Sequence, residues 1–88
     1  MKRIVFSQHA LDQMADRGAS REEVELAIHD GELMPARGMW LSYRKNFPFN
    51  REWKGKPYSV KQVMPVVVEE SDKIIVVTVY VFYFGGTE

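Results

Sequence analysis

The segment from Lys73 to Phe84 constrains the fold more than any other part of the chain, because it is apolar on both of its alternating faces. One face carries Ile75, Val77, Val79 and Val81, and the other carries Ile74, Val76, Thr78, Tyr80 and Phe82. A strand of this kind belongs in the middle of a sheet with something packed on each face. We expect helices on the aliphatic face, so the face of Thr78 and the aromatic residues points towards a cleft, a partner or a second subunit.

The first third of the chain predicts two short helices joined as a hairpin. Ser7 is a good N-cap for a helix over residues 8–17, because its hydroxyl can accept from an unpaired N–H of the first turn. Ser20 and Glu23 have the spacing of a capping box, which predicts a second helix over residues 21–30. These two helices are the most strongly patterned elements of the chain.

After residue 38 the hydrophobic period changes to two, which predicts strands. We expect strands at about 39–44, 56–69 and 73–84, a connection at 46–55 and a short strand at 2–6. Pro65 cannot donate to a ladder, so its strand is bulged there or lies at an edge. The predicted fold is α+β, with two N-terminal helices packed on one face of an antiparallel sheet of three to four strands. The 88 residues are expected to form a single domain over 1–88.

The charges are distributed unevenly, although 12 basic and 12 acidic residues give a net charge of zero. Zero net charge taken alone argues against a nucleic-acid ligand. Residues 37–61, however, hold seven basic side chains against one glutamate, and they interleave with Trp40, Tyr43, Phe47, Phe49, Trp53 and Tyr58. Cations neutralise phosphates and aromatic rings stack on bases, so this block predicts RNA binding. The structural alternative is a solvated strand face with its aromatic residues in the core.

Several classes of site are excluded or disfavoured by composition. The absence of cysteine excludes disulfides, thiolate zinc sites and catalytic thiols. No His-x-x-x-His pair and no phosphate-binding glycine loop occur, so neither a metal nor a cofactor is expected. The apolar runs are too short for a signal peptide or for the ~20 residues of a membrane helix. We therefore expect no membrane association and a location in the cytoplasm.

The remaining inventory of one N-terminal histidine, several cations and several hydroxyls suits RNA cleavage without a metal. A general base removes the proton of a 2′-hydroxyl, and cations stabilise the phosphorane and its leaving group. His9 is the candidate base, and Gln13 and Arg17 follow it along one line of the first predicted helix. The same inventory equally suits a domain that does no chemistry.

Two groups of motifs resemble a known family. They are Phe6-Ser7-Gln8-His9-Ala10-Leu11, Met14, Arg17-Gly18-Ala19-Ser20, Glu23-Val24 and Gly31-Glu32 near the start, and Val77-Thr78-Val79-Tyr80 near the end. The chain resembles the DUF4258 family, whose order of helices followed by a sheet is similar to that of RelE, barnase and colicin-type ribonucleases, many of them toxins. The resemblance implies a metal-independent ribonuclease-like site over the sheet, with His9, Arg17 and Thr78 as candidates and Tyr80 adjacent.

Two readings of the function follow. In the first, the protein is a toxin-like endoribonuclease of the RelE/barnase type. Its predicted catalytic residues are His9, Arg17, Arg44 and Thr78, and its predicted RNA-binding residues are Trp40, Lys45, Lys56, Lys61 and Tyr80. In the second, it is a non-catalytic RNA- or protein-binding module that acts as a homodimer. The dimer is expected through the C-terminal strand, because Tyr80, Phe82 and Phe84 form a large apolar surface for so small a core. An antitoxin-like protein is the other expected partner.

Overall fold

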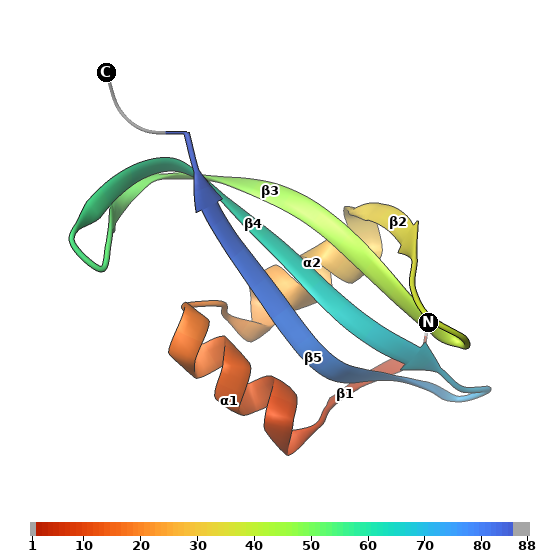
Figure 1. The fold of residues 1–88 in the computed structure, drawn as a ribbon. Coiled ribbons are helices and arrows are strands. Elements are labelled where there is room, and N and C mark those ends of the chain that lie inside the picture. The colour runs from red at the N-terminus through yellow and green to blue at the C-terminus, as the bar shows by residue number, and fades with distance from the viewer. Residues whose placement is uncertain (1, 86–88) are drawn as a thin grey trace.

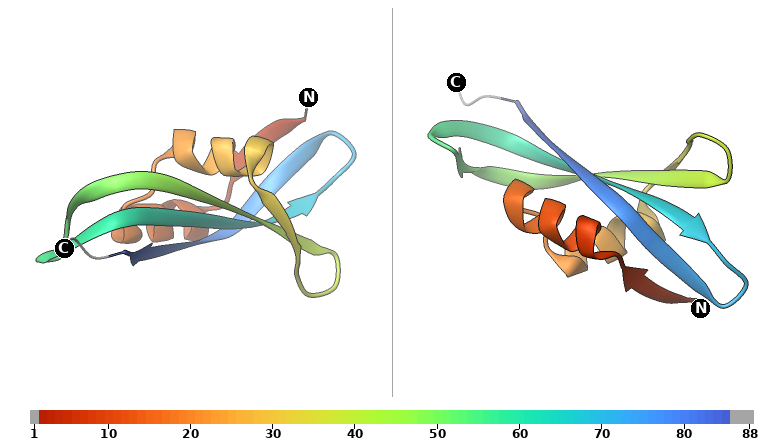
Figure 2. Two further views of the ribbon diagram at one scale, coloured as in Figure 1. Left: turned by 90° about the horizontal axis from the view of Figure 1, so that it is seen from above. Right: turned by 60° about the horizontal axis from the view of Figure 1, so that its bottom comes forward.

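The structure, a computed structural model, describes residues 2–85, which form five strands and two helices (Figure 1). In chain order these are β1 (Arg3–Phe6), α1 (Gln8–Arg17), α2 (Arg21–Asp30), β2 (Glu32–Pro35), β3 (Trp40–Trp53), β4 (Lys56–Glu69) and β5 (Lys73–Phe84). Both helices lie on the same side of the sheet (Figure 2). Neither helix of the described part is long and apolar enough to cross a membrane.

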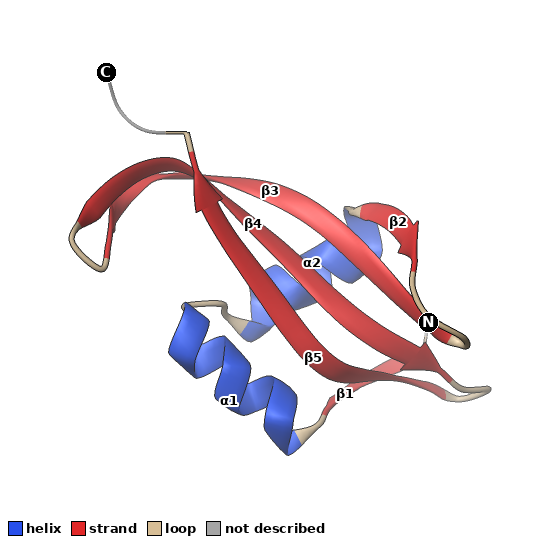
Figure 3. Cartoon of the chain, viewed as in Figure 1, coloured by secondary structure: helices blue, strands red, loops and turns tan. Residues whose placement is uncertain are grey.

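The sheet is mixed, with the strand order β1-β5-β4-β3-β2 (Figure 3). The prediction of an antiparallel sheet of three to four strands is therefore wrong. β1 pairs parallel to the first part of β5, whereas the other neighbouring strands are antiparallel. β1 and β5 are separated in the chain by two helices and three strands, so no hairpin turn joins them and the pair is free to be parallel. The predicted connection at 46–55 is also wrong for most of its length, since β3 continues to Trp53.

The two helices have the predicted bounds, and their ends have the expected chemistry. The Ser7 hydroxyl accepts from the Ala10 N–H at 3.0 Å at the start of α1, and Gly18 ends that helix with φ of 82°. A complete capping box between Ser20 and Glu23 opens α2. Local sequence therefore determines both helices.

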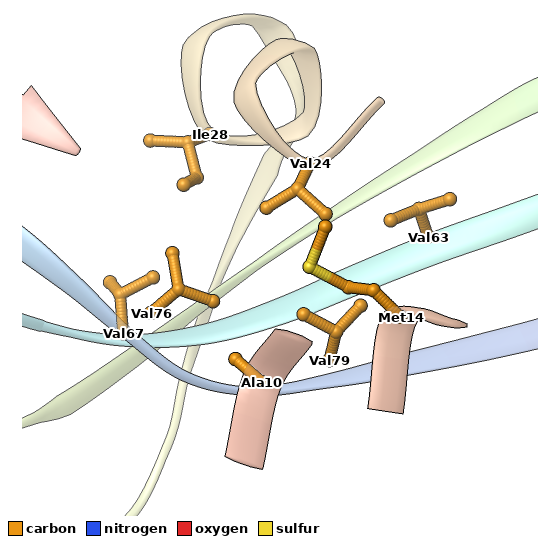
Figure 4. Close-up of a cluster of buried hydrophobic side chains, with 8 residues drawn as sticks. All are labelled: Ala10, Met14, Val24, Ile28, Val63, Val67, Val76 and Val79. Carbon is orange, nitrogen blue, oxygen red and sulfur yellow. The ribbon is translucent and has the colours of Figure 1, made fainter. Parts of the chain in front are cut away.

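The core lies between the helices and the sheet (Figure 4). Its buried side chains are Ala10, Met14, Val24, Ile28, Val63, Val67, Val76 and Val79. α1 packs mainly against β5, and α2 packs against β3 and β4. Burial of these apolar side chains is the main source of stability for the arrangement.

A bulge at Val77 changes which side chains of β5 face the helices. Val66 pairs with Thr78 and the next β4 residue, Val67, pairs with Val76, so Val77 has no partner in β4. An extra residue in a strand reverses the alternation of the residues that precede it. Val76 and Val79 consequently both lie in the core. The predicted aliphatic face is therefore wrong on the N-terminal side of the bulge.

The neighbours of β5 also differ from expectation. β4 pairs with β5 from Ile74 to Phe84, but β1 pairs with β5 only from Lys73 to Val76. β5 therefore has a strand on each side, as predicted, only over its first residues, and the rest of it pairs with β4 alone. Pro65 lies in β4, which is a central strand, and the β3–β4 pairing is interrupted opposite it. The interruption fits a residue that has no N–H to donate.

Candidate nucleic-acid interface

The register of the strands defines the side of the sheet that faces away from the helices. We call this surface the open face. It carries Trp40, Ser42, Arg44 and Asn46 from β3, Val60, Gln62, Met64 and Val66 from β4, and Thr78, Tyr80, Phe82 and Phe84 from β5. Cross-strand rows run Ser42–Val66–Thr78, Asn46–Gln62–Phe82 and Pro48–Val60–Phe84. No pocket is found among residues 2–85, so the open face is a surface rather than a cleft.

Three aromatic side chains of β5 stand exposed on the open face. Tyr80, Phe82 and Phe84 keep 41%, 45% and 42% of their surface accessible. The rings of Tyr80 and Phe82 are nearly parallel, with 6.4 Å between their centroids and 14° between their planes. Alternate residues of one strand thus present a line of flat apolar surfaces.

Arg17 reaches this face from α1 by crossing the edge of β5. Its Nη1 donates to the carbonyl oxygen of Val79 at 2.8 Å, and its Cζ lies 5.3 Å from the centroid of the Tyr80 ring. A guanidinium over an aromatic ring at this distance forms a cation–π contact. The predicted residues Arg17 and Tyr80 are thus brought together.

Arg44 lies near the opposite margin of the same face. It forms an ion pair with Glu32 of the neighbouring β2. Arg44 and Tyr80 belong to one cross-strand row with Met64 between them, so two strand spacings, about 10 Å, separate them. Thr78 shares the face with Arg44 but belongs to the adjacent row.

Two side-chain amides lie in the adjacent row of the open face, Asn46–Gln62–Phe82. Gln62 Nε2 donates to Asn46 Oδ1 at 2.9 Å, and Gln62 is the cross-strand neighbour of Phe82. Neither amide was predicted as a site residue. The alternation of side chains along β4 could have indicated that Gln62 faces away from the helices, because its neighbour Val63 lies in the core.

Lys61 is in a different environment from the other predicted RNA-binding residues. It lies on the helix side of β4 and is only 5% exposed. Its ammonium contacts the Glu23 carboxylate at 2.8 Å and donates to the Gly18 carbonyl oxygen at 2.9 Å. The structure therefore brings Lys61 together with α2 and not with Arg44 or Thr78.

The other predicted residues are dispersed. His9 is exposed on α1, and its imidazole makes no hydrogen bond or ion pair with another residue of 2–85. Lys45 lies on the helix side, with its Nζ 5.7 Å from the Phe47 ring centroid. Lys56 is exposed at the β3–β4 hairpin end, and Trp40, 46% exposed, lies at the other end of β3.

A second aromatic group, on the helix side, holds the hairpin end of β3 and β4 against α1. Tyr83 stacks on Trp53 with 4.9 Å between ring centroids and contacts Phe49 and Tyr58. Its hydroxyl donates to the Arg17 carbonyl oxygen at 2.7 Å. Tyr43 and Phe47 pack against the core as well, so five of the six aromatic residues of the basic block serve packing, as the structural alternative expects.

The open face can stack planar rings, offer amide donors and acceptors, and bind an anion through arginine. In the described part of the chain, no three histidine or acidic side chains gather as metal ligands do. The fold and this face define a small α+β domain with an exposed aromatic sheet surface.

The chain belongs to the family described as "Domain of unknown function (DUF4258)", which it matches over residues 6–81. No curated protein and no solved structure matches it.

Proposed function

We propose that the open face binds single-stranded RNA. The observation that carries the proposal is the line of Tyr80, Phe82 and Phe84, exposed beside two amides and flanked by two arginines. Sheet surfaces with exposed aromatic residues bind single strands because unpaired bases can leave their own stack and lie on the rings. A duplex does not offer its bases in this way.

The amide and arginine groups complete the chemistry of such a site. Free donor and acceptor positions on Asn46 and Gln62 suit the edges of bases that lie on the neighbouring Phe82 ring. Arg17 has no carboxylate within ion-pair distance in the described residues, so its charge is available to a phosphate. The charge of Arg44 is partly neutralised by its ion pair with Glu32.

The hairpin end of β3 and β4 extends the basic surface. Arg51, Lys54 and Lys56 are exposed there, beyond the row that ends at Phe84. Cations placed along the path of a strand increase affinity without selecting sequence. An RNA that follows β5 would thus reach a second set of phosphate contacts.

Binding of a fluorescently labelled single-stranded RNA, followed by anisotropy, tests the proposal. Tyr80→Ala should weaken binding roughly 5- to 150-fold, the equivalent of one stacked base at about 1–3 kcal/mol. Leu33→Ala is the matched control, since Leu33 is 55% exposed but lies on β2 opposite Tyr43 on the helix side. Glu32→Gln should tighten binding by freeing Arg44. Equal binding by wild type and Tyr80→Ala would refute the proposal.

Endoribonuclease activity is the second candidate, because two predicted catalytic residues, Arg44 and Thr78, share the open face. In this reading a general base takes the proton of a 2′-hydroxyl while arginine stabilises the phosphorane. Incubation of RNA with wild type, His9→Ala and Arg44→Ala in the presence of a chelator tests it. Cleavage lost in both variants, with folding intact, supports the enzyme. Binding without cleavage by wild type leaves the non-catalytic module.

A protein partner could cover the same rings. The candidate partners are an antitoxin-like protein and a second copy of the chain. The proposed location is the cytoplasm, where such partners and RNA are present. A protein that covers the open face would compete with RNA, whereas one bound elsewhere would not. Competition in the anisotropy assay separates these cases.

A further inference from the structure

The sheet has two edges that are only partly covered by the short outer strands. β1 pairs with β5 no further than Val76, and β2 pairs with β3 no further than Arg44. In the described part of the chain, residues 77–84 of β5 and 45–53 of β3 therefore have no strand on their outer side. Such edges present unpaired backbone groups that another strand can bind.

The free edge of β3 carries several devices that oppose strand pairing. The carbonyl of Val79 points away from β4, so alternate residues such as Phe84 bond to β4 and its partner Val60 bonds to β5. Pro48 lies opposite Val60, so its missing N–H is on the outer side of β3. The register shifts between Pro48 and Arg51, and Asn50 has φ of 49°. Lys45 and Arg51 add charge. Proline, bulges and charges are the features by which natural edge strands avoid association.

Beyond the bulge at Val77, the free edge of β5 lacks these devices. From Thr78 to Phe84 it has neither a charged residue nor a proline. Within residues 2–85, two side chains bond to the backbone of this edge: the Ser7 hydroxyl donates to the carbonyl oxygen of Val77, and Arg17 donates to the carbonyl oxygen of Val79. The bond from Arg17 shows that the backbone groups of Val79 point outward. Since the groups of alternate residues point to the same side, those of Val81 and Tyr83 also point outward.

We propose that β5 pairs antiparallel with β5 of a second copy of this chain, about a two-fold axis at Phe82. In this register Val81 of each copy lies opposite Tyr83 of the other, and Phe82 lies opposite Phe82. Both outward-pointing residues of each copy then exchange backbone hydrogen bonds. The bond between Arg17 and Val79 is retained, because Val79 lies outside the ladder.

The side chains favour a second copy as the occupant. An interface about a two-fold axis uses the same surface on both copies, and this segment is complementary to itself. On the open face, Tyr80 lies opposite Phe84 of the other copy, so aromatic rings pair across the junction. The segment has no charge with which to select a charged peptide. The pairing extends the sheet and leaves the open face uncovered, so the proposal is independent of RNA binding.

Charge substitution at the two-fold axis gives the main test. Wild type should have twice the 10.2 kDa mass of the chain in light scattering at ~100 μM. Phe82→Lys and Phe82→Glu should each be monomeric, because like charges then lie opposite each other. An equimolar mixture should recover the dimer mass. Circular dichroism checks that both variants fold. A monomeric wild type, or a mixture that stays monomeric, overturns the proposal.

Cysteine crosslinking tests the register. The chain has no cysteine, so each variant carries a single thiol. Directly opposed residues of an antiparallel pair are ~4.5–5.5 Å apart at Cα, within the range of a disulfide. Phe82→Cys should form a covalent dimer on mild oxidation, and Gln62→Cys, on the same face one strand away, should not. Equal crosslinking of the two variants, or faster crosslinking of Val81→Cys, overturns the register.

Discussion

Lys61 of β4 and Glu23 of α2 form an ion pair across the interface between the helices and the sheet, with 2.8 Å between Lys61 Nζ and Glu23 Oε2. The same ammonium donates to the carbonyl oxygen of Gly18, at the end of α1. One side chain therefore ties both helices to the central strand.

Loss of the carboxylate should destabilise the fold more than loss of the whole pair. Glu23→Gln keeps a capping-box side chain but leaves the buried ammonium without a counter-ion, so we expect a loss of about 3 kcal/mol. The double variant Glu23→Gln, Lys61→Met should recover part of this loss, because an apolar chain replaces the unpaired charge. Urea unfolding of the two single variants and the double variant measures the coupling. Additive losses would contradict the expected coupling.

Gly18→Ala should be costly for two separable reasons. Gly18 has φ of +82°, and an added Cβ would lie 2.7 Å from Tyr83 Oη and 2.8 Å from the Trp53 ring. Gly38 has φ of +59° with no atom within 4 Å of such a Cβ. We expect Gly38→Ala to lose about 1 kcal/mol from backbone strain alone and Gly18→Ala to lose roughly 1–3 kcal/mol more. Thermal unfolding of the two variants tests the difference, and equal losses would mean that the ring contacts can relax.

Alkaline pH should weaken the fold through Tyr83. Burial and the negative charge of Glu23 raise the pKa of the Tyr83 hydroxyl above its usual 10.0, although Arg51 opposes the shift. A phenol whose pKa is higher in the folded state stabilises it below about pH 10, and this contribution is lost as the pH rises through the folded-state pKa. Free energies of unfolding between about pH 8 and pH 11 should fall more steeply for wild type than for Tyr83→Phe. The exposed Tyr80→Phe is the control and should follow the wild-type slope.

The Ser42 hydroxyl should hold β2 to the sheet. Ser42 is buried in β3 and donates to the carbonyl oxygen of Met34 at 3.2 Å. Ser42→Ala should cost about 0.5–1.5 kcal/mol, concentrated in β2 because that strand has only one neighbour. Hydrogen exchange should accelerate at Glu32–Pro35 and remain unchanged in β4. A uniform acceleration would show that the hydroxyl supports the whole fold instead.

The helices were predictable from sequence because their determinants are local. The caps Ser7 and Ser20 and the apolar positions between them lie within a few residues of each other. The sheet depends on long-range pairing, and there the prediction failed. The sequence does not indicate that Val77 is the bulged residue, because all residues from Ile75 to Val79 are β-branched and equally suited to a regular strand.

The candidate site was predictable in part for the same reason. Thr78 and Arg44 are both predicted catalytic residues, and the register places both on the open face. Lys61 is predicted to bind RNA because it belongs to the basic block, and its position relative to Arg44 cannot be read from the sequence, since the register of strand 56–69 against strand 39–44 is free. A lysine in an exposed basic block and a lysine that binds a helix have the same local sequence, so only the tertiary pairing with Glu23 separates them.

The parallel pair of β1 and β5 has a consequence for the kinetics of folding. Arg3 pairs with Lys73, so β1 can join the sheet only when a segment 70 residues further along the chain is available for pairing. Contacts of such sequence separation slow folding, because a long loop closes before the contact contributes. During synthesis the helical hairpin can form early, yet β1 has no neighbour until β5 has left the ribosome. A nascent chain would therefore expose the apolar β1 and the partly formed core for most of its synthesis, the period in which chaperones act.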